Sequence, residues 1–419
     1  MAWRVPLPAS VACSEQPTCR IVQMVRRPPN DSLDGAVAAH ILPYPSIGGT
    51  EYGTLRIMKA VESAGVRNIA MNLHLMKPLK RLFEDSGFPV IEWPAPEPSI
   101  RHGKAFWQAS RALAREFRRL NVSLVHCSDY LAAHHTALAG YLAGVPVLCH
   151  IRNRHSEMSF RDRIFLLPVT RFAFVSRDTW NQFAFPVSAQ KGSVLYDGIG
   201  VPSEAEVASG KALAPAIKAE FHLPESSRLI GMVARVAPQK DFDTLVRAAA
   251  IVIAAHPDVR FLIIGDNSMT QVARDHYQHV RQLLDSHGLA DHFTFTGYRS
   301  DTLRLIGGVE IAVLSTHQEG LPLALIETMA FAVPTIATEV DGVPELIEDA
   351  KTGFLCPHQD AGNLAEKIIL LLDDPVRAAA MGLAARQRIL NTFTLENFAD
   401  GIADIYRLML TGRSGGSAV

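Results

Sequence analysis

The chain contains 419 residues, of which 48% are apolar, and its 41 basic and 42 acidic residues leave a formal net charge of −1. This length predicts two or three domains with substantial cores, and the balanced charge argues against nucleic acid as a partner. The five cysteines include no C-x-x-C pair, which excludes a disulfide framework and a cysteine zinc site and fits a reducing cytosol. Neither an apolar run of membrane-spanning length nor a secretory signal is present in the sequence, so we expect a cytoplasmic protein.

The first domain is predicted to follow an irregular N-terminal extension. Residues 1–34 hold prolines and scattered polar residues, with one strand candidate at 20–25. Beyond them, apolar runs of strand length alternate with helical segments, a pattern typical of parallel sheets covered by helices on both faces. We assign residues 35–200 to this Rossmann-like domain. Its predicted strands lie at 36–42, 68–71, 123–127, 145–150, 172–176 and 192–199, and its clearest helices at 51–64 and 104–120.

A second alternating series starts after a boundary near Gly200 and forms a predicted domain over residues 201–392. Its predicted strands lie at 229–236, 260–264, 293–296, 311–314 and 334–337. Its predicted helices lie at 242–255, 301–307, 323–331, 361–372 and 375–390, with one more ending near 287. A last helix within residues 393–411 is expected to pack back across the domains, and residues 412–419 form a tail that is disordered by composition. The fold class is therefore α/β, with two tandem doubly wound domains whose carboxyl strand ends face a common cleft.

The segment from His317 to Ile347 carries the strongest functional signal. A predicted strand is followed by a short loop and by Pro322, which we place as the first helical residue because its missing N–H costs nothing there. The free N–H groups of the loop, around Gly320, Leu321 and Leu323, form a predicted anion site for a diphosphate.

Two glutamates flank this predicted anion site. Glu319 precedes the helix, and Glu327 lies about 7–8 Å further along it, a position that suits hydrogen bonds to the hydroxyls of a ribose. The alternative makes Glu319 a partner of the helix dipole and Glu327 a surface residue. We favour the functional interpretation, because the two glutamates lie in a segment that runs from strand to loop to proline to helix.

This segment resembles glycosyltransferase family 4, a family of retaining enzymes with the GT-B fold. The hallmark of that family is two glutamates separated by seven residues, and here Glu319 and Glu327 enclose GLPLALI. The continuation AFAVP, DGVPELI and TGF also matches. Ala332 stands where the family often has glycine, a departure that affects the geometry of the helix end. The resemblance covers about residues 36–410 and makes residues 35–200 the acceptor-side domain and residues 201–392 the donor domain.

A second match is ARVAPQKDFDTLVRA, which begins at Ala234 and resembles the R-x4-K motif of the family. The resemblance implies that Arg235 and Lys240 hold the departing diphosphate and stabilise its growing negative charge. The alternative is a pair of ordinary solvated basic residues. Asp241 stands where glycine is common, and we interpret it as a helix cap. Asp241 and Asp243 also form a D-x-D pattern, which we do not interpret as a metal site. We therefore expect no metal ion and no cofactor.

Three further positions match the family more locally. Gly48 and Gly49 lie in a loop that would let the backbone approach the donor phosphates, although an ordinary turn explains them as well. The family places a histidine at His150, near the transferred sugar, and the alternative is a structural histidine. Tyr298 follows a strand in a loop that borders the base in the family. Arg152 and Arg154 are candidates to meet an acceptor.

The predicted helix at 104–120 allows two interpretations. Phe106, Leu113 and Phe117 share one face, with arginines around it. We favour a helix that covers the sheet, because a strand follows it, and contact with an acidic membrane surface is the alternative. The second interpretation would place the protein peripherally at the inner face of the membrane.

The resemblance implies transfer of a sugar from a UDP- or GDP-linked donor to the hydroxyl of a sugar or lipid-linked acceptor, with retention and within polysaccharide or glycoconjugate synthesis. His150 and Glu319 would position the sugar, and Glu327 would hold the ribose. Two alternatives remain open: a nucleotide-sugar epimerase on the same fold, and a non-catalytic nucleotide-sugar-binding subunit.

Overall fold

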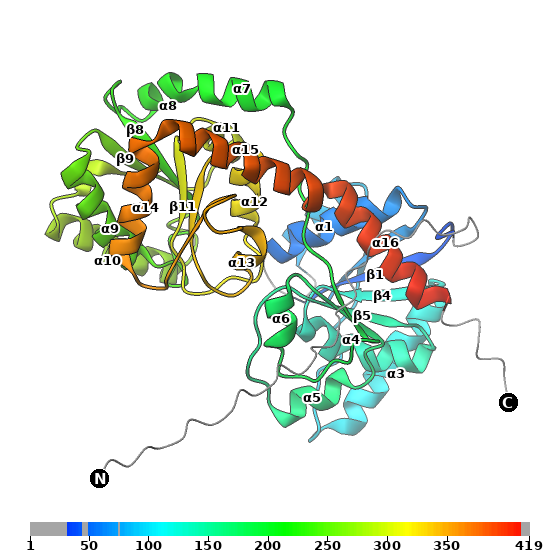
Figure 1. Ribbon diagram of the computed structural model, residues 1–419. Helices are drawn as coiled ribbons and strands as arrows, with labels where there is room; N and C mark the ends of the chain where they lie inside the picture. Colours follow the sequence, from blue (N-terminus) through cyan, green and yellow to red (C-terminus); the bar gives the residue numbers. More distant parts are fainter. Residues whose placement is uncertain (1–31, 44–48, 74–75, 412–419) are drawn as a thin grey trace, which may run out of the picture.

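The computed structural model describes residues 32–43, 49–73 and 76–411. Two parallel β-sheets, each covered by helices on both faces, form two lobes that follow each other along the chain (Figure 1). The strand candidate at 20–25, Gly48 and the predicted tail at 412–419 lie outside the described residues. Within the described part of the chain, no helix is both long and apolar enough to cross a membrane.

The first sheet has the strand order β3-β2-β1-β4-β5-β6-β7, and all its pairings are parallel. Its central strands are buried on both faces, as expected for strands covered by helices on either side. The strands are β1 (Val37–Leu42), β2 (Arg67–Asn72), β3 (Val90–Glu92), β4 (Leu124–Cys127), β5 (Val147–Ile151), β6 (Arg171–Phe174) and β7 (Gly192–Val194).

Six helices of the first lobe cover the two faces of this sheet and its strand ends. The helices are α1 (Gly49–Glu62), α2 (Lys77–Asp85), α3 (Gly103–Arg119), α4 (Tyr130–Ala143), α5 (Phe160–Leu166) and α6 (Arg177–Asn181). Helices α3 and α4 pack on one face, and the apolar side chains Leu113 and Phe117 of α3 are part of this core. The apolar face of α3 is thus buried against the sheet, which supports the sheet-covering interpretation rather than a membrane contact.

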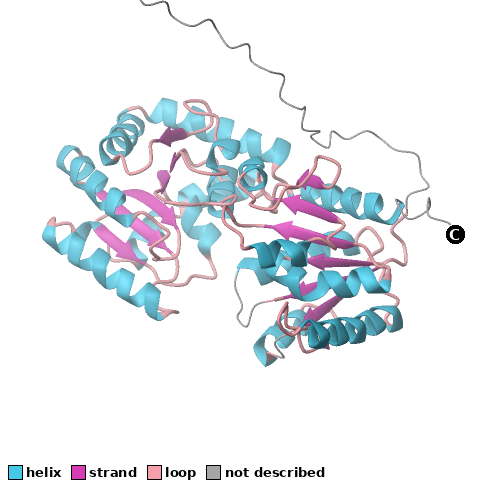
Figure 2. Ribbon diagram, turned by 90° about the horizontal axis from the view of Figure 1, so that it is seen from below, coloured by secondary structure: helices cyan, strands magenta, loops and turns pink. Residues whose placement is uncertain are grey.

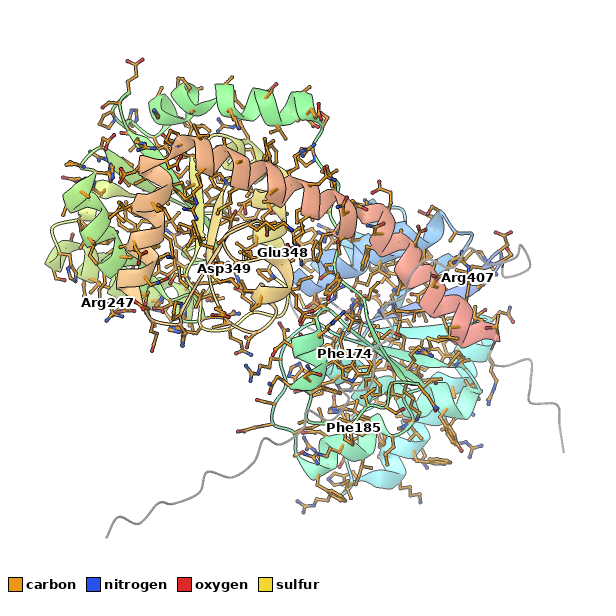
Figure 3. All side chains as sticks on the ribbon, in the orientation of Figure 1. Phe174, Phe185, Arg247, Glu348, Asp349 and Arg407 are labelled. Carbon is orange, nitrogen blue, oxygen red and sulfur yellow. The ribbon has the colours of Figure 1, made fainter. Side chains whose placement is uncertain are left out.

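Aromatic side chains pack together around β6 in the first lobe. Phe174 on β6 stacks on Trp180 of α6, with ring centroids 5.3 Å apart, and Phe185 packs on Phe172 at 5.6 Å. Figure 3 labels Phe174 and Phe185 within this dense group of side chains. Such ring pairs add about 0.5–1.5 kcal/mol beyond the burial of their area, so they hold β6 and the chain that follows it in place.

The second sheet has the strand order β10-β9-β8-β11-β12-β13, again with parallel pairings. Its strands are β8 (Arg228–Val233), β9 (Val259–Ile264), β10 (Phe293–Phe295), β11 (Ile311–Leu314), β12 (Thr335–Thr338) and β13 (Phe354–Cys356). Its helices are α7 (Glu204–Ala212), α8 (Ala214–Glu220), α9 (Phe242–Ala255), α10 (Gln271–Ser286), α11 (Thr302–Gly307), α12 (Leu323–Ala330), α13 (Val343–Leu346), α14 (Ala361–Asp373) and α15 (Pro375–Thr392), with a short 3-10 turn at Ala290–His292.

The final helix α16 (Leu395–Thr411) leaves the second lobe and lies on the first. Figure 1 shows it as the red continuation of α15, and Figure 2 shows the two lobes from below. Its apolar side chains Phe398, Ile402 and Tyr406 are buried with residues of α1 and the first sheet. The crossing is fixed by hydrogen bonds between Ile199 and residues 393 and 395.

The structure moves the start of α12 by one residue. Pro322 has φ −74° and ψ 104°, an extended conformation, so it is the residue before the helix rather than the first helical residue. At the other end, Ala332 has φ +55°, the left-handed conformation that favours glycine. The departure from the family at this position therefore does fall on the helix end.

Candidate active site

Charged residues of the second sheet gather where β8 and β11 end. Lys240 follows β8 and lies just before α9, and Glu319 lies in the loop between β11 and α12. Lys240 Nζ forms an ion pair with Glu319 Oε1, and the Thr316 hydroxyl donates to the same oxygen over 3.1 Å. The Glu319 side chain is 10% exposed, so this carboxylate is held in a defined position and keeps a narrow access to solvent.

The backbone around Glu319 is fixed from the second sheet and from the first lobe. Its N–H donates to Asp341 Oδ2 over 2.8 Å. Asp341 Oδ1 accepts from Arg154, which comes from the first lobe. Arg154 therefore pairs with an acidic residue of the second lobe. The sequence suggested Arg154 as a candidate to contact the acceptor. Asp341 lies in the DGVPELI segment that carries the resemblance, but its position between Glu319 and Arg154 follows only from the fold.

The loop from Gly320 to Leu323 offers unused backbone donors. Within the described residues, the N–H groups of Gly320, Leu321 and Leu323 have no hydrogen-bond acceptor. These groups lie at the amino end of α12, where the helix dipole also favours an anion. A Cβ at Gly320 would lie 2.2 Å from the carbonyl oxygen of Arg152. The loop thus packs directly against the first lobe, and glycine is needed for that approach.

Glu327 lies one helical turn further along α12 and faces the first lobe. Its carboxylate has no hydrogen bond to any described residue, and burial raises its pKa, while Arg56 of α1 opposes part of the rise. A half-buried carboxylate without donors is able to accept two hydrogen bonds from a bound molecule. Arg56 was not singled out in the sequence, because nothing in its surroundings on α1 distinguishes it from a surface arginine.

Arg235 and Tyr298 are both open to solvent. Arg235 follows β8 and is exposed, with no ion pair or hydrogen bond to the residues that the structure describes. The side chain of Tyr298 is 71% exposed in the loop between β10 and α11. The neighbouring Gly265 allows close packing here, since a Cβ on it would lie 2.2 Å from the carbonyl oxygen of Ala234. Arg235 is therefore a cation free to meet an anion at the strand ends.

His150 lies near the end of β5 and is completely buried. Both of its ring nitrogens lack a partner among the described residues, and its ring centroid lies 5.5 Å from that of His126. Burial, followed by the charge of Arg152, holds the pKa of His150 well below its ordinary value, so the ring is neutral. The structure thus places His150 within the lobe rather than on an open surface.

His150 is one of three neighbouring histidines whose rings are tilted against one another. His40 on β1 and His126 on β4 are register partners, and their ring centroids lie 5.3 Å apart. His126 Nδ1 shares a 2.7 Å hydrogen bond with the hydroxyl of Tyr406 on α16, and His40 Nε2 bonds to Asn68. These two histidines are therefore held by side-chain hydrogen bonds, whereas neither ring nitrogen of His150 has a partner in the described part of the chain.

The remaining candidates of the first lobe pack beneath α1. Gly49 begins α1, which begins two residues before the predicted start. Arg152 Nη1 donates to both carboxylate oxygens of Asp197, at 3.1 and 2.9 Å, and its guanidinium lies 3.1 Å from the position that a Cβ at Gly53 would occupy. Arg152 Nη1 is thus paired within the lobe, whereas its Nε and Nη2 are buried without a partner among the described residues.

A second contact joins the two lobes beside the site. The carboxylate of Glu345 on α13 accepts from the N–H groups of Arg177 and Asp178, each over 2.9 Å, and from the Tyr196 hydroxyl over 2.9 Å. Burial, with Glu345 beside it, raises the pKa of Tyr196 to about 12. Together with the Arg154–Asp341 pair, this contact sets how closely the lobes approach.

The arrangement suits a bound diphosphate next to a half-buried carboxylate. Arg235 supplies a free cation, the three loop amides supply donors, and Lys240 holds Glu319 beside them. Such fixed donors and cations stabilise charge that develops on a leaving group. A cavity lined by Val309, Pro334 and Ala332 lies instead at the opposite edge of the sheet, where β11 and β12 begin, away from the edge at which open α/β sheets bind ligands.

Comparisons with known proteins show a similarity to glycosyltransferases in the second lobe. The family model described as glycosyl transferases group 1 matches residues 214–388. N-acetyl-alpha-D-glucosaminyl L-malate synthase of Bacillus anthracis is 27% identical over 190 residues, which cover 45% of this chain and 48% of that protein. UDP-Gal:alpha-D-GlcNAc-diphosphoundecaprenol alpha-1,3-galactosyltransferase of Escherichia coli is 26% identical over 229 residues, 54% of this chain and 57% of that one. The similarity thus spans about half the length of these curated relatives.

Solved structures match over a longer range. Anabaena HepE in complex with UDP and glucose superimposes with a TM-score of 0.74 at 18% identity, covering 88% of this chain and 99% of that one. At 18% identity the match is evidence for the fold alone. The fold is GT-B. Residues 214–388, which include Lys240, Glu319 and Glu327, are thus similar in sequence to the group 1 glycosyltransferases.

Proposed function

We propose that the chain is a retaining glycosyltransferase that moves a sugar from a nucleotide-diphosphate donor to an acceptor hydroxyl without a metal ion in the transfer step. The observation that carries the proposal is the Lys240–Glu319 pair at the ends of β8 and β11, beside the unused amides of Gly320, Leu321 and Leu323. Residues 201–392 would bind the donor, and residues 35–200 would face the acceptor. The helix at 393–411 would pack back across both.

Each residue has a distinct role in this proposal. Arg235, Lys240 and the loop amides hold the diphosphate as its bond to the anomeric carbon breaks. Glu319 lies beside the cationic sugar, and Glu327 accepts hydrogen bonds from the ribose. The acceptor oxygen attacks from the face that the diphosphate leaves, and its proton passes to the departing diphosphate oxygen, so no separate base is needed. Gly48 and Gly49 bring backbone close to the phosphates, and Tyr298 borders the base.

His150 is proposed to lie beside the sugar when the donor is bound. Its two unpartnered ring nitrogens support this role, since buried polar groups normally have a partner. A neutral imidazole has one donor and one acceptor, so it is able to bond to a sugar hydroxyl. The acceptor is a sugar or a lipid-linked hydroxyl, by analogy with the Escherichia coli relative, whose name gives a diphosphoundecaprenol-linked acceptor.

The first experiment measures the thermal midpoint of the full chain with UDP, GDP and ADP. A nucleotide at 100 times its dissociation constant adds about 2.7 kcal/mol to the free energy of unfolding. We expect UDP or GDP to raise the midpoint of the wild type, with UDP first because the HepE structure contains it. Glu327→Ala should lose this response, and the control Glu366→Ala, at an exposed position on α14, should keep it.

Product analysis then separates the alternatives. A nucleotide-sugar epimerase would convert the donor without any acceptor, and a binding subunit would not turn it over at all. The proposed transferase releases nucleoside diphosphate in proportion to acceptor and keeps the anomeric configuration, which proton NMR of the product reports. An inverted product would overturn the retaining mechanism, and the absence of nucleotide stabilisation would overturn the donor site.

A further inference from the structure

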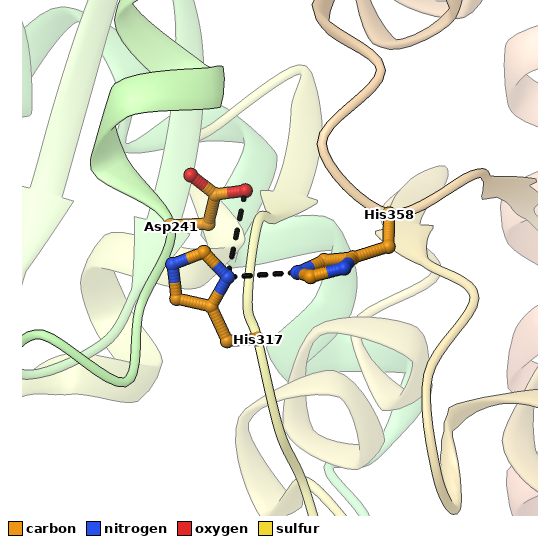
Figure 4. A group of neighbouring side chains, drawn as sticks. All are labelled: Asp241, His317 and His358. Atoms are coloured by element: carbon orange, nitrogen blue, oxygen red, sulfur yellow. Dashed lines mark hydrogen bonds and ion pairs between the residues drawn. The ribbon is translucent and has the colours of Figure 1, made fainter.

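A group of three metal-ligating side chains lies beside the candidate donor site without being part of it. Asp241 at the start of α9, His317 in the loop after β11 and His358 in the loop after β13 converge in space (Figure 4). One potential ligand atom from each lies within 4.8 Å of the other two. The three residues come from three separate loops of the second lobe, so the fold, not the local sequence, brings them together.

The distances in this group suit a small tetrahedral ion. His317 Nδ1 lies 2.7 Å from His358 Nε2 and 3.9 Å from Asp241 Oδ2. Two ligands bound about 2.1 Å from a tetrahedral ion lie about 3.4 Å apart. The observed separations lie on either side of that value, so small rotations of the two exposed imidazole rings bring all three atoms into range.

Asp241 provides an independent indication of a missing cation. The residue is 2% exposed, and its Oδ1 accepts from the Thr244 N–H over 3.0 Å, which caps α9 as the sequence predicted. Its Oδ2 is buried and has no hydrogen-bond partner in the described part of the chain. A buried carboxylate oxygen without a partner is costly, and this oxygen points into the histidine group, where a cation would satisfy it (Figure 4).

We propose that Asp241, His317 and His358 bind a divalent transition-metal ion, with Zn²⁺ as the first choice. Two imidazoles and one carboxylate suit zinc and its neighbours, whereas Mg²⁺ and Ca²⁺ prefer oxygen ligands only. Three protein ligands leave a fourth position for water or another oxygen. This site is distinct from the D-x-D interpretation that the sequence disfavoured, because Asp243 is not a ligand.

The ion would brace the loops that carry the donor residues. Asp241 follows Lys240 directly, and His317 precedes Glu319 by two residues. Their backbones are already joined, because the His317 N–H donates to the Gln239 carbonyl over 2.9 Å. His358 lies outside this pair of loops, so the ion would tie the β13–α14 loop to both. The transfer step itself would still use the cations Arg235 and Lys240.

The test uses the tag-free, full-length protein after treatment with a chelator. Co²⁺ titration should give one equivalent of tightly bound ion with the intense visible bands of a low-symmetry site, and Zn²⁺ should displace it. His358→Ala and His317→Ala should each raise the dissociation constant for Zn²⁺ at least tenfold. Asp241→Asn should also weaken binding while keeping the helix cap, since asparagine caps as well as aspartate.

The matched control is His279→Ala. His279 is exposed on the neighbouring helix α10 and pairs with Asp243 at 3.2 Å, so its loss should leave Zn²⁺ affinity unchanged. Circular dichroism of each variant checks that it is folded. The proposal is overturned if His358→Ala binds Zn²⁺ as tightly as the wild type, or if the wild type shows no saturable binding, which would leave the group as a chain of hydrogen bonds. Because the readout is metal binding, failure here does not bear on the proposed transferase activity.

Discussion

The two sheets follow the same topology but carry different chemistry at equivalent places. In each, the order in which successive strands are added to the sheet reverses between two central strands, β1 and β4 in the first sheet and β8 and β11 in the second. Ligands of open α/β sheets bind at such points. In the first sheet, His40 and His126 fill this place as buried, neutral rings. In the second, the strands lead to Lys240 and Glu319. A shared topology therefore does not decide which lobe holds the charged groups.

The difference extends to how well the polar groups are satisfied. Glu319 is bonded through its side chain and its backbone, to Lys240, Thr316 and Asp341. His150 in the first lobe has no partner for either ring nitrogen among the described residues. The Lys240–Glu319 ion pair has its partners in place, whereas the buried ring of His150 does not, so mutations at the two places should have different effects on stability and turnover.

The largest effect is expected at Lys240. Lys240→Met removes the cation beside Glu319 and should lower donor turnover by about 100-fold or more, the scale found when one stabilising group is lost from an active site. It also leaves the Glu319 carboxylate buried without its ion pair, so the thermal midpoint should fall. Steady-state release of nucleoside diphosphate measures the first effect. Lys351→Met is the control, because Lys351 is exposed and its ion pair is with Glu348, away from the site. Wild-type turnover by Lys240→Met would show that the second lobe does not hold the leaving group.

Glu327→Gln should abolish nucleotide stabilisation and yet make the empty protein more stable at neutral pH. Burial raises the pKa of the Glu327 carboxyl, with Arg56 opposing part of the rise. A raised pKa means that the stabilisation from this group is complete below the ordinary glutamate pKa and is lost as the pH rises through the raised value. An uncharged glutamine does not incur that loss.

The pH profile of the unfolding midpoint, with and without UDP, measures both effects. The gain of Glu327→Gln over the wild type should shrink as the pH falls from the raised pKa towards the ordinary glutamate pKa. An equal gain at every pH would mean that burial of the charge is not its cause.

The histidines of the first lobe should respond in opposite ways. His126→Leu leaves the Tyr406 hydroxyl without its partner in the core and should cost about 1–3 kcal/mol of unfolding free energy. His150→Leu removes a ring with no partner, so stability should change little, while donor turnover should fall if the ring contacts the sugar. Chemical denaturation and kinetics on both variants make the comparison. A large loss of stability in His150→Leu with normal turnover would make His150 a structural residue.

The smallest effect is expected in the segment that joins the lobes. Ser203 and Glu206 form a reciprocal capping box at the start of α7. Ser203→Ala should cost about 1 kcal/mol, because one amide at the helix start loses its acceptor, and turnover should stay unchanged. Denaturation with parallel kinetics checks both parts. A marked loss of turnover would link this joint to the approach of the lobes.

The sequence predicted much of the regular structure because strand and helix periodicity are local. The strands at β1, β8 and β11 and the helix α9 were found within a few residues of their observed bounds. The sequence predicted a boundary near Gly200 and no helix over residues 201–224, which contain three prolines, yet this segment folds into α7 and α8. Pro215 lies in the first turn of α8, where proline is tolerated, so its presence did not break the helix.

The sequence by itself determined the motifs, and the tertiary structure decided their neighbours. Spacing and resemblance identified Lys240, Glu319 and Glu327, since these lie in short, ordered segments. Three features could not be predicted: Arg56 near Glu327, Asp341 between Glu319 and Arg154, and the convergence of Asp241, His317 and His358. Each joins residues far apart in the chain, and only the packing of strand ends and of the two lobes brings such residues within bonding distance.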